Sequence, residues 1–335
     1  MKDGFLLSTK FVPPATAQDV VWVESFLRKM EQAERYGVIL VRAGAGYGKS
    51  AMLSAYMARA GLPFFWLTLT EEDAELPVFL AGLIQAIRAR RPSLLADAAR
   101  MLEESEEPGR SWRYILNAWI NGIHALDGEE VWLIIEDCHL VQETTEINRA
   151  LEYLLRHSPP NLRVVLTSRY PFTFLPVSEW KLKGRLLLVD EEDLAFDERE
   201  ISQFMRSRRD RKLTRREAAA IREGTEGWPI AVEMIAGALS EKEPLEEVLA
   251  DLRASAGDLF TFLAADVLER LPAELREFAL RVSVLRSLND AICTALFGDE
   301  ARRFLAELPQ RGVLLQDYGR GNYGFHRLFR DFLLY

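Results

Sequence analysis

The fold is decided by an apolar run that leads directly into glycines, Val38-Ile39-Leu40-Val41-Arg42-Ala43-Gly44-Ala45-Gly46-Tyr47-Gly48-Lys49-Ser50. The apolar part is typical of a short strand buried on both faces of a parallel sheet. A helical pattern follows over residues 51–59. Residues 43–50 fit the phosphate-binding loop pattern, with Ala43 in place of the usual first glycine. Glycines let successive backbone N–H groups face phosphate oxygens, and the helix N-terminus adds positive potential.

The end of this stretch carries the two side chains that such a loop needs for ATP or ADP with Mg²⁺. Lys49 is expected to reach the β- and γ-phosphates, and Ser50 is expected to ligate Mg²⁺. The predicted nucleotide contacts are the whole loop and the residue after it, Ala43, Gly44, Ala45, Gly46, Tyr47, Gly48, Lys49, Ser50 and Ala51. The alternative is a glycine-rich turn that only connects a strand to a helix.

Four further short apolar runs follow in the first half of the chain, Phe64–Leu69, Val131–Ile135, Val164–Leu166 and Leu186–Val189. Helical patterns lie between them, as over residues 79–87 and 114–126. Strands that alternate with helices predict βαβ units. We therefore expect an α/β fold with a five-stranded parallel sheet and helices on both of its faces.

An acidic pair, Glu136-Asp137, directly follows the third of these strands. Carboxylates at the end of a buried strand are costly unless they serve a cation or a hydrogen-bond network. After a phosphate-binding loop, this position predicts that Glu136 holds Mg²⁺ through water and that Asp137 orients or deprotonates the attacking water. The first acid in this position is usually Asp, so Glu136 brings an extra methylene. The alternative is that both acids cap the following helix.

An arginine, Arg169, closes the fourth apolar run. At the end of a strand and level with the phosphate-binding loop, its guanidinium could sense a γ-phosphate. The alternative is a surface salt bridge. Because the carboxyl ends of parallel strands meet at one edge, we expect the groups after the first, third and fourth strands to converge there. Lys49, Glu136, Asp137 and Arg169 are the predicted catalytic residues.

From about residue 197 the pattern becomes almost wholly helical. The predicted helices cover residues 198–206, 215–222, 228–239, 244–252 and 259–278. Residues 302–335 read as helix, strand (312–316), glycine-containing turn, strand (323–325) and helix, which is the outline of a winged helix. We predict three domains: a P-loop domain of AAA+-like type over 1–196, a small helical domain over 197–257 and a winged-helix domain over 258–335.

The composition is that of an ordinary globular chain of 335 residues, with 42 Lys and Arg against 51 Asp and Glu and a net charge of −9. The acidic balance argues against nucleic-acid binding driven by overall charge. Cys138 and Cys293 lie too far apart in sequence to build a disulfide framework, which favours a cytoplasmic protein.

No apolar run approaches the roughly 20 residues of a membrane span, and the N-terminus lacks a signal-peptide pattern. The helical pattern that reaches Tyr335 without a cap predicts a longer natural polypeptide.

A basic run over residues 206–216 holds seven Lys and Arg with one Asp, Arg206-Ser207-Arg208-Arg209-Asp210-Arg211-Lys212-Leu213-Thr214-Arg215-Arg216. Such a run could contact nucleic acid, but it has no interleaved aromatic side chains on which bases could stack. We favour a solvated connection between two helices.

Together these motifs resemble the MalT-like transcriptional regulators among the signal-transduction ATPases with numerous domains (STAND). The matching segments are spread over nearly the whole chain, Leu6–Lys10, Ala45–Ser50, Trp66–Leu69, Glu136–His139, Thr167–Arg169, Gly227–Pro229 and Phe325–Leu333. The family usually has an arginine soon after its opening prolines, whereas residues 20–24 here read Val-Val-Trp-Val-Glu. The resemblance therefore extends to the phosphate contacts and not to that arginine near the base.

Two residues of the second half gain a role only through the resemblance. It implies that Pro229 packs near the nucleotide base and that His326 contacts the β-phosphate of bound ADP. From the residues alone, Pro229 begins a helix, because proline suits the first helical position. A lone histidine at a helix start, such as His326, is more often structural.

The resemblance implies the nucleotide-binding core of a transcriptional activator, switched by ATP and ADP. ADP would hold a closed resting state, exchange for ATP would permit opening and self-assembly, and slow hydrolysis would reset the switch. The implied partners are the nucleotide, an inducer or protein sensed by a missing C-terminal region, and DNA only through a missing domain, with no membrane. The alternatives are a constitutive AAA-type ATPase acting on nucleic acid or protein, a STAND signalling scaffold outside transcription, and a scaffold with an inactive nucleotide site.

Overall fold

The computed structural model describes residues 6–15, 20–105, 108–126, 128–238, 267–285, 288–311, 313–319 and 321–334. The chain forms two compact units. The first comprises residues 1–20, 24–43 and 49–190, and the second comprises residues 21–23, 44–48 and 191–335. The glycine-rich loop 44–48 thus belongs to the second unit, while the strand before it and the helix after it belong to the first. The division into three domains stays a prediction.

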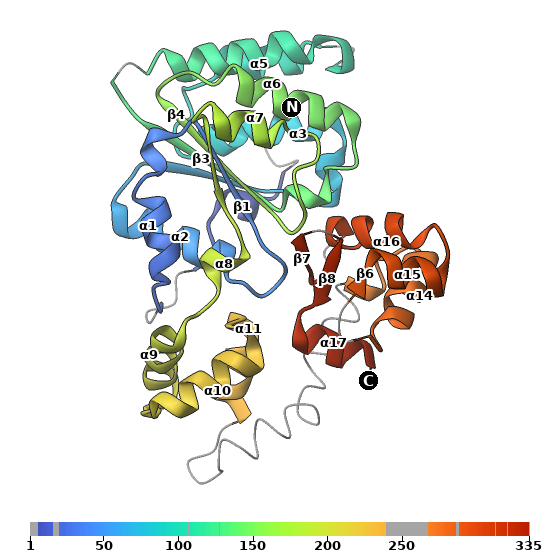
Figure 1. Cartoon of the computed structure of the whole chain (residues 1–335). Helices are drawn as coiled ribbons and strands as arrows, with labels where there is room; N and C mark the ends of the chain where they lie inside the picture. Colours follow the sequence, from blue (N-terminus) through green and yellow to red (C-terminus); the bar gives the residue numbers. More distant parts are fainter. Residues whose placement is uncertain are drawn as a thin grey trace. The chain divides into compact units, whose positions relative to one another are not determined.

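The first unit is built on a five-stranded parallel sheet with the order β2-β3-β4-β1-β5 (Figure 1). Its strands are β1 (Val38–Arg42), β2 (Phe64–Thr68), β3 (Val131–Glu136), β4 (Leu162–Ser168) and β5 (Leu186–Val189). All five predicted strands and the α/β fold are confirmed. In the register, Val38 of β1 lies beside Val164 of β4 and Leu186 of β5. Since strand order reverses around β1, its carboxyl end lies where open α/β sheets bind ligands.

Helices cover both faces of this sheet (Figure 1). They are α1 (Glu24–Met30), α2 (Lys49–Ala60), α3 (Leu76–Arg88), α4 (Ala96–Glu103), α5 (Pro108–His124), α6 (Thr145–Arg156) and α7 (Val177–Leu182), with short 3₁₀ turns at Ser8–Phe11, Ala33–Arg35, Glu71–Ala74 and Cys138–Leu140. Leu40, Leu133 and Leu166 join a core with residues of α3, α5 and α6. Their strand neighbours Ile39 and Ile134 are also buried and point to the opposite face of the sheet, because side chains alternate along a strand.

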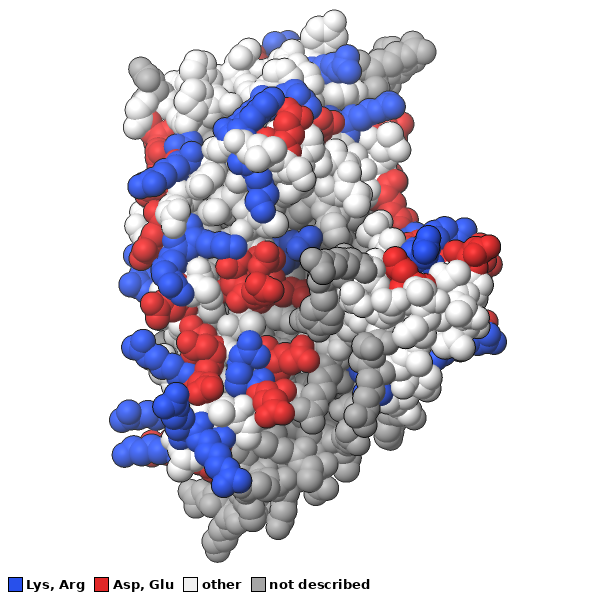
Figure 2. Space-filling view, viewed as in Figure 1, with Lys and Arg blue, Asp and Glu red and all other residues white. Residues whose placement is uncertain are grey.

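The second unit begins with four helices, α8 (Glu191–Leu194), α9 (Glu198–Arg209), α10 (Arg215–Thr225) and α11 (Pro229–Ala238). Capping boxes open α9 and α10, where Asp197 pairs with Glu200 and Thr214 with Glu217. These caps satisfy N–H groups that a helix start leaves unpaired. The basic run covers the last turn of α9, the short connection and the start of α10, in the region of the blue group at the lower left of Figure 2. Most of its side chains are exposed, so the run is a solvated segment that joins two helices and includes their ends.

The rest of the second unit has a winged-helix arrangement, as predicted. Its elements are α14 (Ala273–Val282), β6 (Leu288–Asn289), α15 (Asp290–Phe297), α16 (Ala301–Glu307), the 3₁₀ turn Pro309–Arg311, β7 (Leu315–Gly319), β8 (Asn322–Phe325) and α17 (Arg327–Leu334). The three strands form an antiparallel sheet with the order β6-β8-β7, in which β7 and β8 make the hairpin of the wing (Figure 1).

Several local predictions for this region were wrong or untested. The helix predicted over 259–278 is interrupted within its described part, because α14 begins only after Pro272, which suits a helix start. The first hairpin strand lies three residues later than predicted, and α15 and β6 were not predicted. The predicted helix 244–252 lies outside the described residues. No helix among the described residues is long and apolar enough to cross a membrane.

Candidate functional site

Lys49 lies at the first position of α2, where the sequence predicted a phosphate-binding lysine. Its side chain is only 8% exposed, and its ammonium donates a hydrogen bond to the Ala43 carbonyl at 2.7 Å. The Ala43 N–H in turn donates to the Ser168 carbonyl at 3.2 Å, which joins the end of β1 to the end of β4. The structure therefore brings Lys49 back over the carboxyl end of β1, within the first unit.

Glu136 is the last residue of β3, and it is 3% exposed. One carboxylate oxygen, Oε2, accepts hydrogen bonds from the Trp66 indole N–H at 3.1 Å and the Thr68 hydroxyl at 3.4 Å. The other, Oε1, is buried and has no hydrogen-bond partner. Burial raises the pKa of Glu136, and hydrogen bonding from the Ser50 hydroxyl opposes that shift.

This geometry fits the Mg²⁺ role predicted for Glu136 and Ser50. A buried carboxylate oxygen without a partner is costly, and a cation or a cation-bound water would satisfy it. Ser50 lies in α2 and Glu136 ends β3, and the Ser50 hydroxyl lowers the pKa of the Glu136 carboxyl. No group of three or more His, Cys, Asp and Glu side chains in the described ranges could hold a metal ion. Mg²⁺ would therefore draw its other ligands from water and nucleotide phosphates.

Asp137 adopts a left-handed backbone conformation, with φ of 58°. Its N–H donates to the Thr167 hydroxyl at 3.1 Å, and its side chain makes no capping hydrogen bond to the turn that follows. A carboxylate oxygen lies 3.8 Å from Nδ1 of the buried His139. The capping interpretation therefore does not describe Asp137, and its side chain remains about one-third exposed at the sheet edge.

Arg169 is the first residue after β4 and is half-buried. Thr167, two residues before it, bonds to Asp137, and Ser168 pairs with Arg42 at the end of β1. The ends of β1, β3 and β4 are therefore neighbours, as expected from the strand pattern. This edge of the first unit brings together Lys49, Ser50, Glu136, Asp137 and Arg169.

The loop Gly44–Gly48 is held by hydrogen bonds to other parts of the second unit. The Gly44 N–H donates to the Glu191 carboxylate at 2.9 Å. The Trp228 indole N–H donates to the Ala45 carbonyl at 3.0 Å, and the Ile230 N–H donates to the Gly46 carbonyl at 3.2 Å. The turn between α10 and α11 thus fixes two successive carbonyl groups of the loop.

Two glycines of the loop meet different surroundings. Gly46 has φ of +74°, and a Cβ there would lie 2.5 Å from the Ile230 side chain. Gly48 also has φ of +74°, but a Cβ there would meet nothing within 4 Å. Gly46 is therefore required by close packing as well as by backbone conformation, whereas Gly48 lies open to solvent.

Pro229 begins α11, as the residues alone predicted. The residue before it makes the contacts to the loop. Trp228 is fully buried, and its ring packs against Tyr47 of the loop at 6.3 Å between centroids. No contact described for Pro229 tests its predicted place near the nucleotide base, so that role stays a prediction.

His326 lies immediately before α17 and is 2% exposed. Its ring packs edge-on against Trp228 at 5.3 Å, and its Nε2 lies 3.6 Å from a carboxylate oxygen of Glu226. Neither ring nitrogen has a hydrogen-bond partner. Burial lowers the pKa of His326, the Glu226 carboxylate and the Thr225 backbone oppose this shift, and Arg222 adds to it. His326 is therefore a buried, neutral imidazole that faces the residues around the loop.

Acidification is expected to destabilise the second unit through His326. The unfolded chain takes up a proton near pH 6.5, whereas the folded chain does not because burial lowers the histidine pKa. Stability that is fully present above about pH 6.5 is then lost as the pH falls below it. Thermal unfolding from about pH 8 to about pH 5 should show a smaller decline in His326→Gln than in wild type. Equal declines would contradict this account.

Sequence reasoning missed three groups that hold the loop. Trp228 lies within the segment Gly227–Pro229, and nothing in that pattern names Ala45 as the partner of its indole N–H. Glu191 follows β5 at the start of a short helix, a place where an acid is ordinary. The Ile230 contact uses backbone atoms, so its side chain gave no signal.

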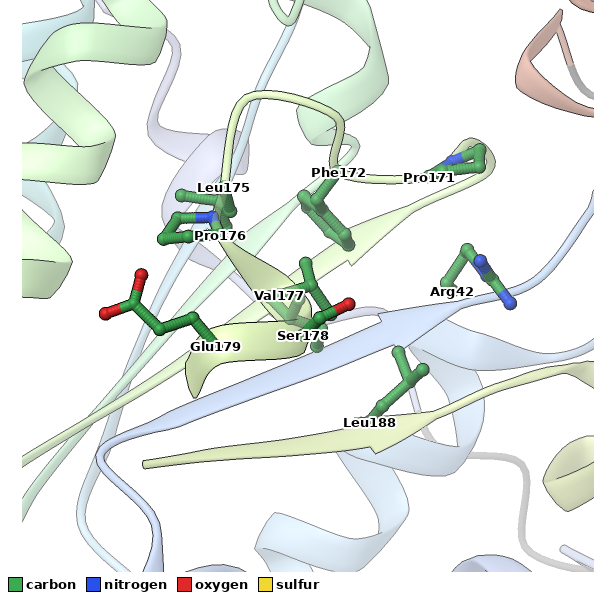
Figure 3. Close-up of a pocket in the computed structure, with 10 residues that line it drawn as sticks. Arg42, Pro171, Phe172, Leu175, Pro176, Val177, Ser178, Glu179 and Leu188 are labelled. Atoms are coloured by element: carbon green, nitrogen blue, oxygen red, sulfur yellow. The ribbon is translucent and has the colours of Figure 1, made fainter. Parts of the chain in front are cut away.

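A separate pocket of about 450 Å³ opens in the first unit (Figure 3). It lies between β1, β5 and residues 171–179, and its lining is mostly apolar and includes Leu40, Leu188 and Phe172. Arg42 and Glu179 lie at different sides of it (Figure 3). None of the predicted nucleotide-site residues lines this pocket.

The parallel sheet with strand order 2-3-4-1-5, the loop after its first strand and the winged-helix region define a P-loop NTPase fold with a winged helix. Residues 264–335 match the family described as the MalT winged helix domain. The fold of the Walker-type ATPase of Pyrococcus abyssi is similar, with a TM-score of 0.67 at 16% identity over 97% of this chain and 99% of that one.

Two curated proteins resemble nearly the whole sequence. The serine/threonine-protein kinase PknK of Mycobacterium tuberculosis is 29% identical over 332 residues, which cover 97% of this chain and 30% of PknK. The HTH-type transcriptional regulator MalT of Yersinia pestis is 28% identical over 335 residues, which cover 98% of this chain and 36% of MalT. The chain thus spans about a third of the length of these relatives. Its sequence is therefore similar to that of MalT, and its fold is that of the P-loop NTPases.

Proposed function

We propose that this chain is the nucleotide-binding core of a regulator, switched by ATP and ADP. The observation that carries the proposal is the group at the sheet edge, where Lys49 and Ser50 follow the glycine-rich loop directly and Glu136 has a buried, unpartnered oxygen. A lysine, a hydroxyl and a carboxylate in this arrangement suit the phosphates of a nucleotide and the Mg²⁺ that accompanies them.

In this proposal each group at the edge has a separate task. The loop N–H groups and Lys49 bind the phosphates, and Ser50 and Glu136 hold Mg²⁺, which neutralises phosphate charge when it is bound. Asp137 orients the attacking water or takes its proton, and its partly exposed carboxylate leaves room for that water. Arg169 senses the γ-phosphate. Slow hydrolysis then converts the ATP state into the ADP state.

The ADP state is proposed to depend on His326. As a neutral imidazole without a hydrogen-bond partner, it can donate one N–H to the β-phosphate. Exchange for ATP would weaken that contact, and a ligand shifts a conformational equilibrium only through such a difference in affinity. The three proposed domains, 1–196, 197–257 and 258–335, are the parts that would move.

The partners remain proposals taken from the relatives. The name of MalT as a transcriptional regulator supports an output in transcription. Self-assembly in the ATP state, an inducer or partner protein, and DNA contact are proposed on the same basis. The name of PknK as a kinase supports an output in signalling outside transcription as the second candidate.

The switch is tested by comparing the affinities of the protein for ADP and ATP. We expect the purified protein to bind ADP and ATP with Mg²⁺ in calorimetry, and His326→Ala to weaken ADP binding by about tenfold or more while ATP binding changes less. The reason is the loss of a hydrogen bond to a charged phosphate, which is made only in the ADP state.

The exposed His157 supplies the matched control, because its imidazole packs against Tyr153 and belongs to none of the proposed nucleotide contacts. It should leave both affinities unchanged. Equal ADP binding by wild type and His326→Ala would overturn the ADP contact. Absence of any nucleotide binding by wild type would overturn the proposed function itself.

A further inference from the structure

We propose that Trp228 is a positioning residue that sets the phosphate-binding loop and links it to His326. This inference rests on the proposed nucleotide function and adds a regulatory contact to the same site. It concerns residues of the second unit alone: the loop Gly44–Gly48, the turn between α10 and α11, and the start of α17.

Two carbonyl groups of the loop are anchored by hydrogen bonds from Trp228 and Ile230. The Trp228 indole donates to the Ala45 carbonyl at 3.0 Å, and the Ile230 N–H donates to the Gly46 carbonyl at 3.2 Å. In a planar trans peptide, the carbonyl of one residue and the N–H of the next point in opposite directions. Fixing these two carbonyls toward the turn therefore directs the N–H groups of Gly46 and Tyr47 away from it. A phosphate-binding loop needs successive N–H groups turned to one side.

The loop is also tightly packed against Trp228 and Ile230. Trp228 is fully buried, and Tyr47 of the loop is 5% exposed against its ring. A Cβ on Gly46 would lie 2.5 Å from Ile230, so the loop backbone and the turn are already in contact. The loop cannot change its shape there without moving the turn, because close-packed groups have no free space to relax into.

The indole of Trp228 also contacts the His326 ring. The His326 ring packs edge-on against Trp228, at 5.3 Å between centroids and an interplanar angle of 71°. Glu226, two residues before Trp228, approaches the same imidazole at 3.6 Å. A change at the loop that moves Trp228 must therefore alter the surroundings of His326. The indole of Trp228 contacts both Tyr47 of the loop and His326.

The test compares Trp228→Phe with Trp119→Phe in the full chain. Phenylalanine keeps a ring but removes the indole N–H. Trp119 is also fully buried and donates to a backbone carbonyl, that of Leu83, at 3.1 Å in the first unit. Trp228→Phe should weaken ADP binding about three- to tenfold in calorimetry, the size expected for one hydrogen bond. Trp119→Phe should lose a similar bond yet leave ADP affinity unchanged. Wild-type affinity in Trp228→Phe, or equal weakening in both variants, would overturn the proposal.

Hydrogen exchange supplies a readout that does not depend on nucleotide. Trp228→Phe should speed exchange of the amides around residues 44–48, and Trp119→Phe should not. Unchanged exchange in the loop would also overturn the role of Trp228.

A double variant tests the link to His326. If the two side chains act together, Trp228→Phe and His326→Gln should be non-additive on ADP affinity, whereas strict additivity would remove the link. Lys49→Ala in the same assay reports on nucleotide binding itself. The failure of the Trp228 proposal can thereby be told apart from the failure of the proposed function.

Discussion

Replacing Lys49 with alanine is expected to lower the affinity for ATP and ADP by about 100-fold, which corresponds to about 3 kcal/mol of binding free energy. The lysine is 8% exposed and its ammonium lies at the Ala43 carbonyl, directly after the glycine-rich loop. A buried cation at this point contributes a charge-assisted hydrogen bond to phosphate that alanine cannot replace. Titration calorimetry with each nucleotide in the presence of Mg²⁺ measures the loss.

The control for this variant is Lys183→Ala. Lys183 is exposed and forms an i,i+4 pair with Glu179 at 2.6 Å, so its removal changes the net charge equally without touching the loop. It should bind both nucleotides as wild type does. If Lys49→Ala also keeps normal affinity while remaining folded, residues 43–50 are only a turn between a strand and a helix.

The sequence was sufficient for the central sheet and for the edge that carries the candidate site. The five apolar runs are short and unbroken, and β1, β3 and β4 are buried on both faces, so their type could be predicted from the pattern alone. The parallel arrangement then placed the ends of β1, β3 and β4 side by side. Glu136 ends β3, and Lys49 and Arg169 come after β1 and β4, so the placement of these residues at one edge of the sheet followed from topology.

The winged-helix region was predicted in outline and misplaced in detail. Its strands are short, so their limits depend on pairing that the sequence does not display. The two-residue β6 exists only because Leu288 pairs with Tyr323 of β8. The helix α15 is held by the Asn289 side chain, which accepts a hydrogen bond from the Ala291 N–H.

The contacts that hold the loop Gly44–Gly48 could not be predicted, because they join residues about 150 to 270 positions apart. Trp228, Glu191 and Leu314 all reach the loop from separate elements of the second unit. None belongs to a local pattern that names its partner. Long-range contacts of this kind depend on tertiary packing and leave no period in the sequence. The loop could be recognised from sequence, whereas the residues that control its shape could not.

Replacing Gly227 with alanine is expected to destabilise the second unit by about 3–5 kcal/mol and to lower its unfolding midpoint by about 10 °C. Gly227 has φ of +77°, and a Cβ there would lie 3.0 Å from the Phe196 nitrogen and closer still to the Phe196 carbonyl oxygen. The left-handed conformation alone costs roughly 1–2 kcal/mol for a residue with a side chain. The backbone contact adds more, because the Phe196 N–H already donates to the Gly227 carbonyl at 2.8 Å and cannot withdraw without losing that bond.

Gly184→Ala separates the two contributions. Gly184 also has a positive φ, of +64°, but a Cβ there would meet nothing within 4 Å, so only the conformational cost of roughly 1–2 kcal/mol applies. Urea and thermal unfolding of both variants, followed by circular dichroism, should rank Gly227→Ala well below Gly184→Ala. Because Gly227 precedes Trp228, nucleotide affinity should also fall in Gly227→Ala and stay unchanged in Gly184→Ala. Equal stability of the two variants would show that the Phe196 backbone yields to the added methyl group and that Gly227 is needed only for its φ.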